Sequence, residues 1–174
     1  MAACCRMKKQ VNIVFRAGLG VEARLLKQKR KGLWTHVGLL IGKDLFESVP
    51  DTEDKKGGVV KSSLDLFCAK EKALFTAFLP IYIDSAQAAR LRNWCDLCHK
   101  RQSPFDSTYD LANDTAFYCS EFVYKAFRHT GIILCTEPFT RVHIPLSGTK
   151  SIIFPIDLAG TRKILMGLPA STRL

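Results

Sequence analysis

Residues 117–127 read FYCSEFVYKAF and have the pattern of an amphipathic helix that begins at a cysteine. The i, i+3, i+4, i+7 and i+8 positions of this stretch share one helical face, and they are occupied by Cys119, Phe122, Val123, Ala126 and Phe127. We therefore predict a helix over 119–131 that ends at Gly131, with the thiol in its first turn and directed toward the core.

The position of Cys119 admits two interpretations. A cysteine on an apolar helical face is usually a packing residue. The first turn of a helix, however, carries unpaired N–H groups and the positive end of the helix dipole, which favour a thiolate and could stabilise an oxyanion. The choice depends on whether the fold brings a base to the thiol.

Two stretches further upstream predict a β-hairpin that carries a candidate base. THVGLLIG at 35–42 and LFESV at 45–49 are both strand-like, and His36 opens the first of them. A turn at Gly42 and Lys43 would place glycine in the first central position, as a type II′ turn prefers.

The register of this hairpin decides whether His36 has a carboxylate partner. With the turn at 42–43, Gly38 pairs with Glu47, which then lies on the His36 face one diagonal step away. Cys119, His36 and Glu47 would then match the nucleophile, base and orienting carboxylate of acyl-transfer enzymes. A slip of one residue in the register would move Glu47 to the opposite face of the hairpin. In the alternative without a catalytic role, His36 is a packed strand histidine and Glu47 a solvent-exposed carboxylate.

The other histidines suit different roles. His129 lies at the end of the predicted helix, and His143 falls in a loop or edge strand. His99 belongs to CDLCH at 95–99, which formally matches a haem-attachment pattern or half a zinc site. That segment lies inside a predicted helix over 84–101, and no second ligand pair completes a zinc site, so we expect no metal ligand and no cofactor.

Composition restricts the class of protein and its partners. The chain of 174 residues is expected to form one domain (1–174, core about 11–160), and its odd count of seven cysteines favours reduced thiols over a disulfide framework. We see no signal peptide and no apolar run of membrane length, and we expect a cytoplasmic protein. The net charge of +10 is concentrated partly in RLLKQKRKG at 24–32. This segment could contact an anionic lipid or polymer surface, whereas no motif supports nucleic-acid binding.

The remaining segments give a coarse order of elements. We predict a strand at 11–18, a helical turn within 21–30, and loops at 50–58 and 102–115. The stretch ALFTAFLPIYI at 73–83 predicts one or two strands, with Pro80 marking an edge or a break. Residues 151–160 are expected to be extended.

THVGLLIG followed by FES, with YDLANDTAFYCSEFVYKAF downstream, resembles the YiiX/YebB-type hydrolases. These are circularly permuted members of the NlpC-type, papain-like cysteine peptidase superfamily. The resemblance covers roughly residues 11–160, and FPIDLAG at 154–160 is similar to a Pro-x-Asp-Leu element of these proteins. It implies an α+β, circularly permuted papain-like fold, in which a twisted antiparallel sheet or half-barrel packs against helices.

The resemblance also implies roles for individual residues. Cys119 would be the nucleophile, His36 the base and Glu47 the orienting residue. Tyr109 and Asp110 match the YD that precedes the cysteine and would line the site, with Tyr109 a donor near the oxyanion. Ser120 belongs to the same motif and would support the helix start beside the oxyanion position.

The sequence therefore predicts a thiol hydrolase that acts on an amide or ester carbonyl through an acyl-enzyme. A small peptide, amide or acylated molecule is the expected substrate, and the sequence specifies no oligomeric state. Two alternatives stay open: a lipid-directed acyl hydrolase or acyltransferase, suggested by residues 24–32, and a catalytically silent binding module on the same fold. The chain departs from the family pattern in its first strand and in the basic loop before His36, and both departures leave the substrate open.

Overall fold

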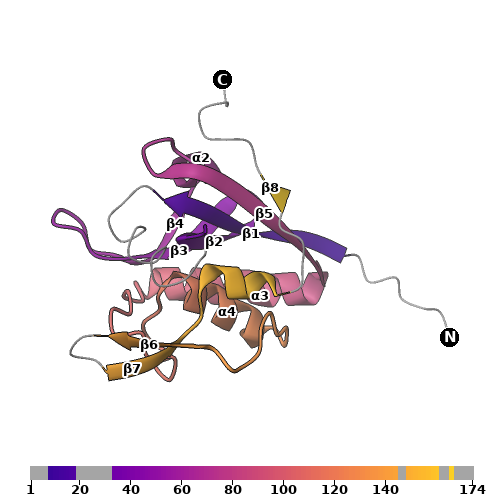
Figure 1. Cartoon of the computed structure of the whole chain (residues 1–174). Helices are drawn as coiled ribbons and strands as arrows, with labels where there is room; N and C mark the ends of the chain where they lie inside the picture. The colour runs from indigo at the N-terminus through magenta and orange to yellow at the C-terminus, as the bar shows by residue number, and fades with distance from the viewer. Residues whose placement is uncertain (1–7, 19–32, 145–147, 161–164, 167–174) are drawn as a thin grey trace.

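The computed structural model describes residues 8–18, 33–144, 148–160 and 165–166. Its main element is a twisted antiparallel sheet in the order β4-β3-β2-β1-β5-β8 (Figure 1). In sequence order its strands are β1 (Lys8–Gly18), β2 (His36–Ile41), β3 (Asp44–Val49), β4 (Gly58–Ser62), β5 (Ala73–Asp84) and β8 (Leu165–Met166).

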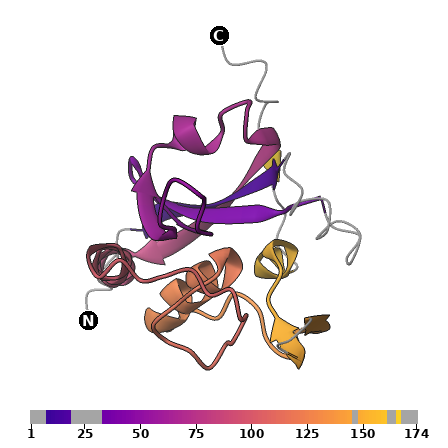
Figure 2. The same ribbon diagram turned by 90° about the vertical axis from the view of Figure 1, so that its left-hand side faces the viewer.

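Helices α3 (Ser85–Lys100) and α4 (Cys119–His129) lie together on one face of this sheet, and the short helix α2 (Leu64–Phe67) lies on the other (Figures 1 and 2). Alternation along β1 explains the two faces, because neighbouring side chains of a strand point in opposite directions. The side that packs on α3 and α4 carries Val11, Ile13, Phe15 and Ala17. The opposite side carries a smaller cluster of Val14, Leu45, Phe67 and Cys68.

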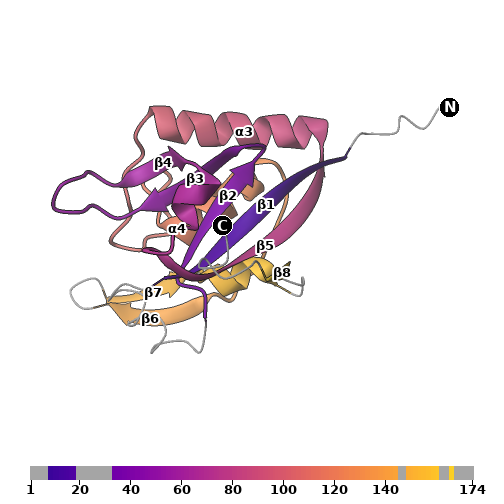
Figure 3. The same cartoon turned by 90° about the horizontal axis from the view of Figure 1, so that it is seen from above.

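The C-terminal part adds a separate hairpin and a short 3₁₀ helix. Strands β6 (Thr140–Ile144) and β7 (Gly148–Ile152) pair with each other beside the main sheet, and η1 (Pro155–Ala159) follows them (Figure 3). The backbone N–H of Ile153 donates to the hydroxyl of Tyr118 at 3.0 Å. This bond ties the end of β7 to the residue that immediately precedes α4.

Arg92 of α3 fastens the β2–β3 hairpin to the helical layer. Its guanidinium donates to the carbonyl of Ile41 at 3.2 Å, to the carboxylate of Asp44, and to Asp96 one turn along α3 at 2.9 Å. Asp44 also forms an ion pair with Lys61 of β4 at 3.1 Å. The turn end of the hairpin is therefore held by contacts to both a helix and the next strand.

Most of the predicted elements are present, 73–83 lies in one strand rather than two, and one prediction is wrong in part. Strand β5 is continuous, so Pro80 does not break it; among the described residues, β8 pairs only with Ala77 and Phe78 of β5. Residues 155–159 form η1 instead of an extended segment. Proline at its first position and Asp157, whose carboxylate accepts from the N–H of Phe154 at 2.8 Å, explain the turn.

Some expectations concern residues outside the described part of the chain. The basic segment 24–32 and the whole of the predicted helical turn at 21–30 are among them. Within the described residues, no helix combines the length and the apolar character needed to span a membrane.

Candidate active site

His36 and Glu47 form the centre of the candidate site. Nε2 of His36 lies 2.7 Å from Oε2 of Glu47, and both side chains are buried. Strands β2 and β3 pair Ile41 with Asp44 and Leu39 with Phe46, which is the predicted register and places both side chains on one face. Gly42 has a φ of 63°, as the first position of a type II′ turn requires.

A serine from β4 completes the environment of the carboxylate. The hydroxyl of Ser62 donates to Oε1 of Glu47 at 2.9 Å, so each carboxylate oxygen has one hydrogen-bond partner. Burial alone would raise the pKa of Glu47, but the hydrogen bond from His36 and the nearby positive charges outweigh it and lower the pKa to about 2. Glu47 is therefore an anion at every pH at which the protein would work.

Cys119 is the first residue of α4, and its side chain interacts with His36. Burial by itself would raise the pKa of the thiol, but hydrogen bonding to His36 and the positive charge of the imidazole lower it. The same contact raises the pKa of His36 against the opposing effect of burial, with Glu47 contributing in the same direction. Since Nε2 of His36 is engaged by Glu47, Nδ1 is the ring nitrogen left for the thiol. These shifts favour a thiolate–imidazolium pair.

The start of α4 is held in place by buried polar contacts. The hydroxyl of Ser48, on the helix-facing side of β3, donates to the carbonyl of Phe117 at 2.5 Å. Glu121 accepts from the N–H of Tyr118 at 3.2 Å and forms an ion pair with Lys125 at 3.0 Å. Burial raises the pKa of Glu121 to about 7, even though Lys125 works against this shift. The residue supports the helix start from within the core.

The three other predicted site residues lie around the same helix start. Ser120 is buried, with its hydroxyl 3.8 Å from the sulfur of Cys119. The ring of Tyr109 packs against that of Tyr118 at 5.1 Å between centroids, and Tyr109 has a φ of 53°. Asp110 donates its backbone N–H to the buried carboxylate of Asp106 at 2.6 Å.

These positions do not test the predicted roles in substrate or oxyanion binding. Among the described residues that line the cavity beside His36, neither Tyr109 nor Asp110 is present. Asp106 was not singled out by sequence reasoning. Its carboxylate also accepts two hydrogen bonds from Thr108, so it organises the loop that carries Tyr109.

Sequence reasoning also missed Arg16 and Phe67. Arg16 of β1 lies directly opposite His36 of β2, and its guanidinium lies 4.6 Å from the centroid of the Phe67 ring. The same ring lies 5.7 Å from the imidazole of His36. An arginine directly after the apolar run IVF of the predicted strand was the available signal for Arg16, whereas Phe67 belongs to a short helix that the sequence pattern did not predict.

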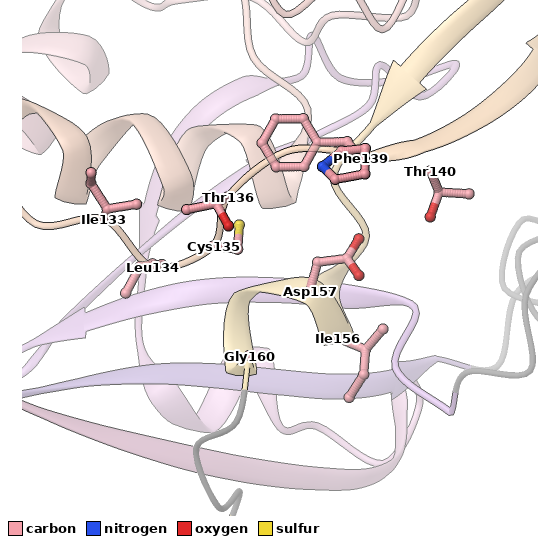
Figure 4. A pocket seen from close by; sticks show the side chains of 10 residues that line it. Ile133, Leu134, Cys135, Thr136, Phe139, Thr140, Ile156, Asp157 and Gly160 are labelled. Carbon is pink, nitrogen blue, oxygen red and sulfur yellow. The ribbon is translucent and has the colours of Figure 1, made fainter.

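A cavity of about 500 Å³ opens beside this group of residues. His36, Glu47 and Arg16 form part of its wall, and strand β4, the loop 50–57 and the turn before β5 supply the rest. A second cavity of about 520 Å³ lies between the segment after α4 and η1 (Figure 4). Ile133, Phe139 and Ile156 line this second cavity, and neither His36 nor Cys119 does.

The Cys95–Cys98–His99 group serves packing. Both cysteines are buried in α3, and burial raises the pKa of Cys98 to about 11 and raises that of Cys95 well above its ordinary value. Nδ1 of His99 lies 3.2 Å from the carbonyl oxygen of Val59. Among the described residues, no group of three or more His, Cys, Asp or Glu side chains is arranged to hold a metal ion.

Comparison with known proteins places this chain in a family. Residues 12–144 match the family of permuted papain-like amidases of the YaeF/YiiX type, the C92 peptidase family. The chain belongs to this family. The predicted resemblance and the α+β, permuted papain-like fold are thereby confirmed, and membership in the C92 amidases supports a cysteine-hydrolase-like function.

A solved structure agrees with the C92 assignment. The crystal structure of the metalloprotein YiiX from Escherichia coli O157:H7 is similar with a TM-score of 0.67. The match covers 92% of this chain and 97% of that chain at 16% sequence identity, so it shows a shared fold. No curated protein sequence matches the chain.

Proposed function

We propose that this C92 family member is a cysteine-dependent hydrolase that cleaves an amide or ester through an acyl-enzyme on Cys119. The position of His36 carries the proposal, because its ring is hydrogen-bonded to the carboxylate of Glu47 and lies close enough to Cys119 to lower the pKa of the thiol. Glu47 would fix the orientation of the imidazole and stabilise its protonated form. A packing role for Cys119 would not require a buried ion pair beside it.

Acylation would begin with transfer of the Cys119 proton to His36. The thiolate would attack the carbonyl carbon, and the protonated imidazole would then give its proton to the leaving amine or alcohol. A thioester between Cys119 and the acyl group would remain. In the second half, His36 would take a proton from water, the hydroxide would attack the thioester, and the thiol would leave with that proton.

The tetrahedral intermediates of both halves carry a negative oxygen. Helix α4 begins at Cys119, and the first N–H groups of a helix have no partner within it, so they would be available to stabilise an oxyanion. The backbone of Val37 also contacts the sulfur. Ser120 and Tyr109 remain candidates for additional donors.

The related YiiX structure is described as that of a metalloprotein. The side chains described in this chain do not form a set of metal ligands.

Alkylation by iodoacetamide at neutral pH tests the proposal, with peptide mass spectrometry to follow each cysteine. We expect Cys119 to react faster than Cys135, which is also partly exposed, and His36→Ala to slow Cys119 by about tenfold or more. His143→Ala is a matched control, because His143 lies exposed on β6. If Cys119 reacts no faster than Cys135 and His36→Ala has no effect, the chain is instead a silent binding module.

A further inference from the structure

Arg16 is a half-buried cation in the wall of the cavity beside His36. Its Nη1 donates to the carbonyl of Phe67 at 3.2 Å, and its guanidinium lies over the Phe67 ring. Within the described part of the chain, no carboxylate lies at ion-pair distance from it. A guanidinium has five N–H donors, so several of them remain for a ligand.

The nearest buried anion is already engaged. Both oxygens of Glu47 have hydrogen-bond partners, in His36 and Ser62, and Glu47 acts on Arg16 only through its charge. A partly desolvated charge that no carboxylate of the described residues pairs with is costly to the folded protein. Recognition of an anion is a physical reason for keeping such a charge at this place.

The rest of the cavity wall has the same sign of charge. Four lysines line it together with Arg16, against two acidic residues, Glu47 and Glu71; the lysines are Lys55, Lys56, Lys61 and Lys72. Lys61 is paired with Asp44, which leaves the other three to contribute an exposed positive rim. Walls with one sign of charge raise the local concentration of oppositely charged ligands.

The position of Arg16 relates this charge to the reacting groups. Arg16 and His36 are direct cross-strand partners, and the guanidinium of Arg16 interacts electrostatically with the thiolate of Cys119. Cys119 is not among the described residues that line the cavity, so the path from an anion at Arg16 to a carbonyl held at Cys119 would pass His36, which lies in the wall.

We propose that the substrate carries a carboxylate or phosphate group and that Arg16 binds this group in the cavity, with the lysine rim attracting it. This inference deepens the proposed function and rests on it. It concerns specificity, since Arg16 would contact a part of the substrate that does not react.

Two alkylating reagents that differ only in charge test the inference. Iodoacetate carries a carboxylate and iodoacetamide does not, so the ratio of their rates at Cys119 measures the local preference for an anion. A change in the pKa of the thiol alters both rates together and leaves the ratio unchanged. The ratio thereby separates recognition by Arg16 from general activation of the nucleophile.

We expect Arg16→Gln to lower the iodoacetate-to-iodoacetamide ratio by roughly tenfold, the effect of one charge-assisted contact. Arg90→Gln, which removes the same charge from an exposed position of α3, should leave the ratio unchanged. Because Arg16 is half-buried, the double variant Lys55→Gln/Lys72→Gln provides a second measurement at exposed positions. It should lower the ratio by about twofold to threefold.

The outcomes distinguish this inference from the proposed function. Slow reaction of Cys119 with both reagents, unaffected by His36→Ala, would contradict the proposed function and the inference together. If Cys119 reacts fast with iodoacetamide but the iodoacetate-to-iodoacetamide ratio is the same in the wild type, in Arg16→Gln and in the double lysine variant, the inference alone is overturned.

A protection experiment identifies the source of the anion. Glutarate, glycerol phosphate and phosphatidylglycerol vesicles are each added before iodoacetamide, with phosphatidylcholine vesicles as the neutral control. Protection by glutarate or glycerol phosphate that disappears in Arg16→Gln would support a small anionic substrate and identify its group. Protection by the anionic vesicles only would indicate attraction to a lipid surface and contradict recognition in the cavity.

Discussion

His36 and Glu47 reach each other across a hairpin whose turn consists of two residues, with 2.7 Å between Nε2 and Oε2. The pair is almost fully buried, and the exposed fractions are 9% for His36 and 4% for Glu47. A neutral histidine could remain buried without a carboxylate, whereas an imidazolium could not do so at low cost. The geometry therefore stabilises the charged form of His36.

Glu47→Gln should lower kcat/KM for a p-nitrophenyl ester or an N-acyl amide by about 10- to 100-fold. The amide preserves the shape of the side chain but removes the charge that stabilises the imidazolium, and each tenfold corresponds to about 1.4 kcal/mol. Glu71→Gln is the matched control, because Glu71 lines the same cavity without contacting His36. Unchanged turnover by Glu47→Gln would remove Glu47 from the proposed triad.

The rate of alkylation of Cys119 should rise at a lower pH than that of an ordinary thiol. The positive charge of His36 lowers the pKa of Cys119, and the thiolate in turn raises the pKa of His36. In His36→Ala that charge is gone, so the profile should move to higher pH. Rates with iodoacetamide from about pH 5 to about pH 10, a range that brackets the ordinary pKa values of histidine and cysteine side chains, give the measurement. Identical profiles would show that the two side chains do not interact.

Ser62→Ala should reduce activity by a smaller amount than Glu47→Gln, about threefold to tenfold. The change leaves Oε1 of Glu47 without its 2.9 Å hydrogen bond but retains the contact with His36. A hydrogen bond to a charged group contributes about 1.5–3 kcal/mol, part of which affects the orientation of the carboxylate. Ser62→Thr retains a hydroxyl and should recover part of the loss. An equal loss in both variants would show that the hydroxyl is not responsible.

Glu47 should contribute to stability at neutral pH and lose this contribution in acid. Its pKa is lowered from 4.5 to about 2 in the folded state, so the stabilisation is complete above pH 4.5 and disappears as the pH falls toward 2. Its size is on the order of 3 kcal/mol. Urea unfolding between pH 7 and 3 checks this expectation. Glu47→Gln should show a weaker dependence on pH across this window, and an identical slope would contradict it.

Gly38→Ala should destabilise the sheet and disturb the site together. A Cβ at this position would lie 3.1 Å from the carbonyl oxygen of Phe46 and 3.2 Å from the ring of Phe67, which also packs against His36. Crowding of this kind costs about 1–3 kcal/mol. Thermal unfolding measures the cost, and alkylation of Cys119 measures the displacement of His36. A variant with wild-type values in both would show that the neighbouring groups move aside freely.

The sequence pattern was most informative where the pairing is local. The register between β2 and β3 followed from a two-residue turn, and the face of α4 followed from helical periodicity. The short elements β4 and α2 were missed because each is too brief to show a period. Missing these two elements left two residues of the site unpredicted, since β4 supplies Ser62 and α2 supplies Phe67.

Long-range placement was beyond any pattern in the sequence. Arg16 and His36 are neighbours only because β1 pairs with β2, and no local signal specifies that register. The contact between Cys119 and His36 likewise depends on how α4 packs on the sheet. Family resemblance predicted that contact, whereas the residues alone offered a nucleophile and a base without a distance between them.

The hydrogen bond from Ser48 to the carbonyl of Phe117 spans 69 positions along the chain. The hairpin that unites His36 and Glu47 requires only local closure, so it can form early during folding, while docking of α4 closes a far larger loop. Until that docking occurs, Cys119 is an ordinary thiol with a normal affinity for protons. Nucleophilicity would thus arise only when α4 docks on the sheet, and the nascent chain would be protected from premature alkylation and oxidation.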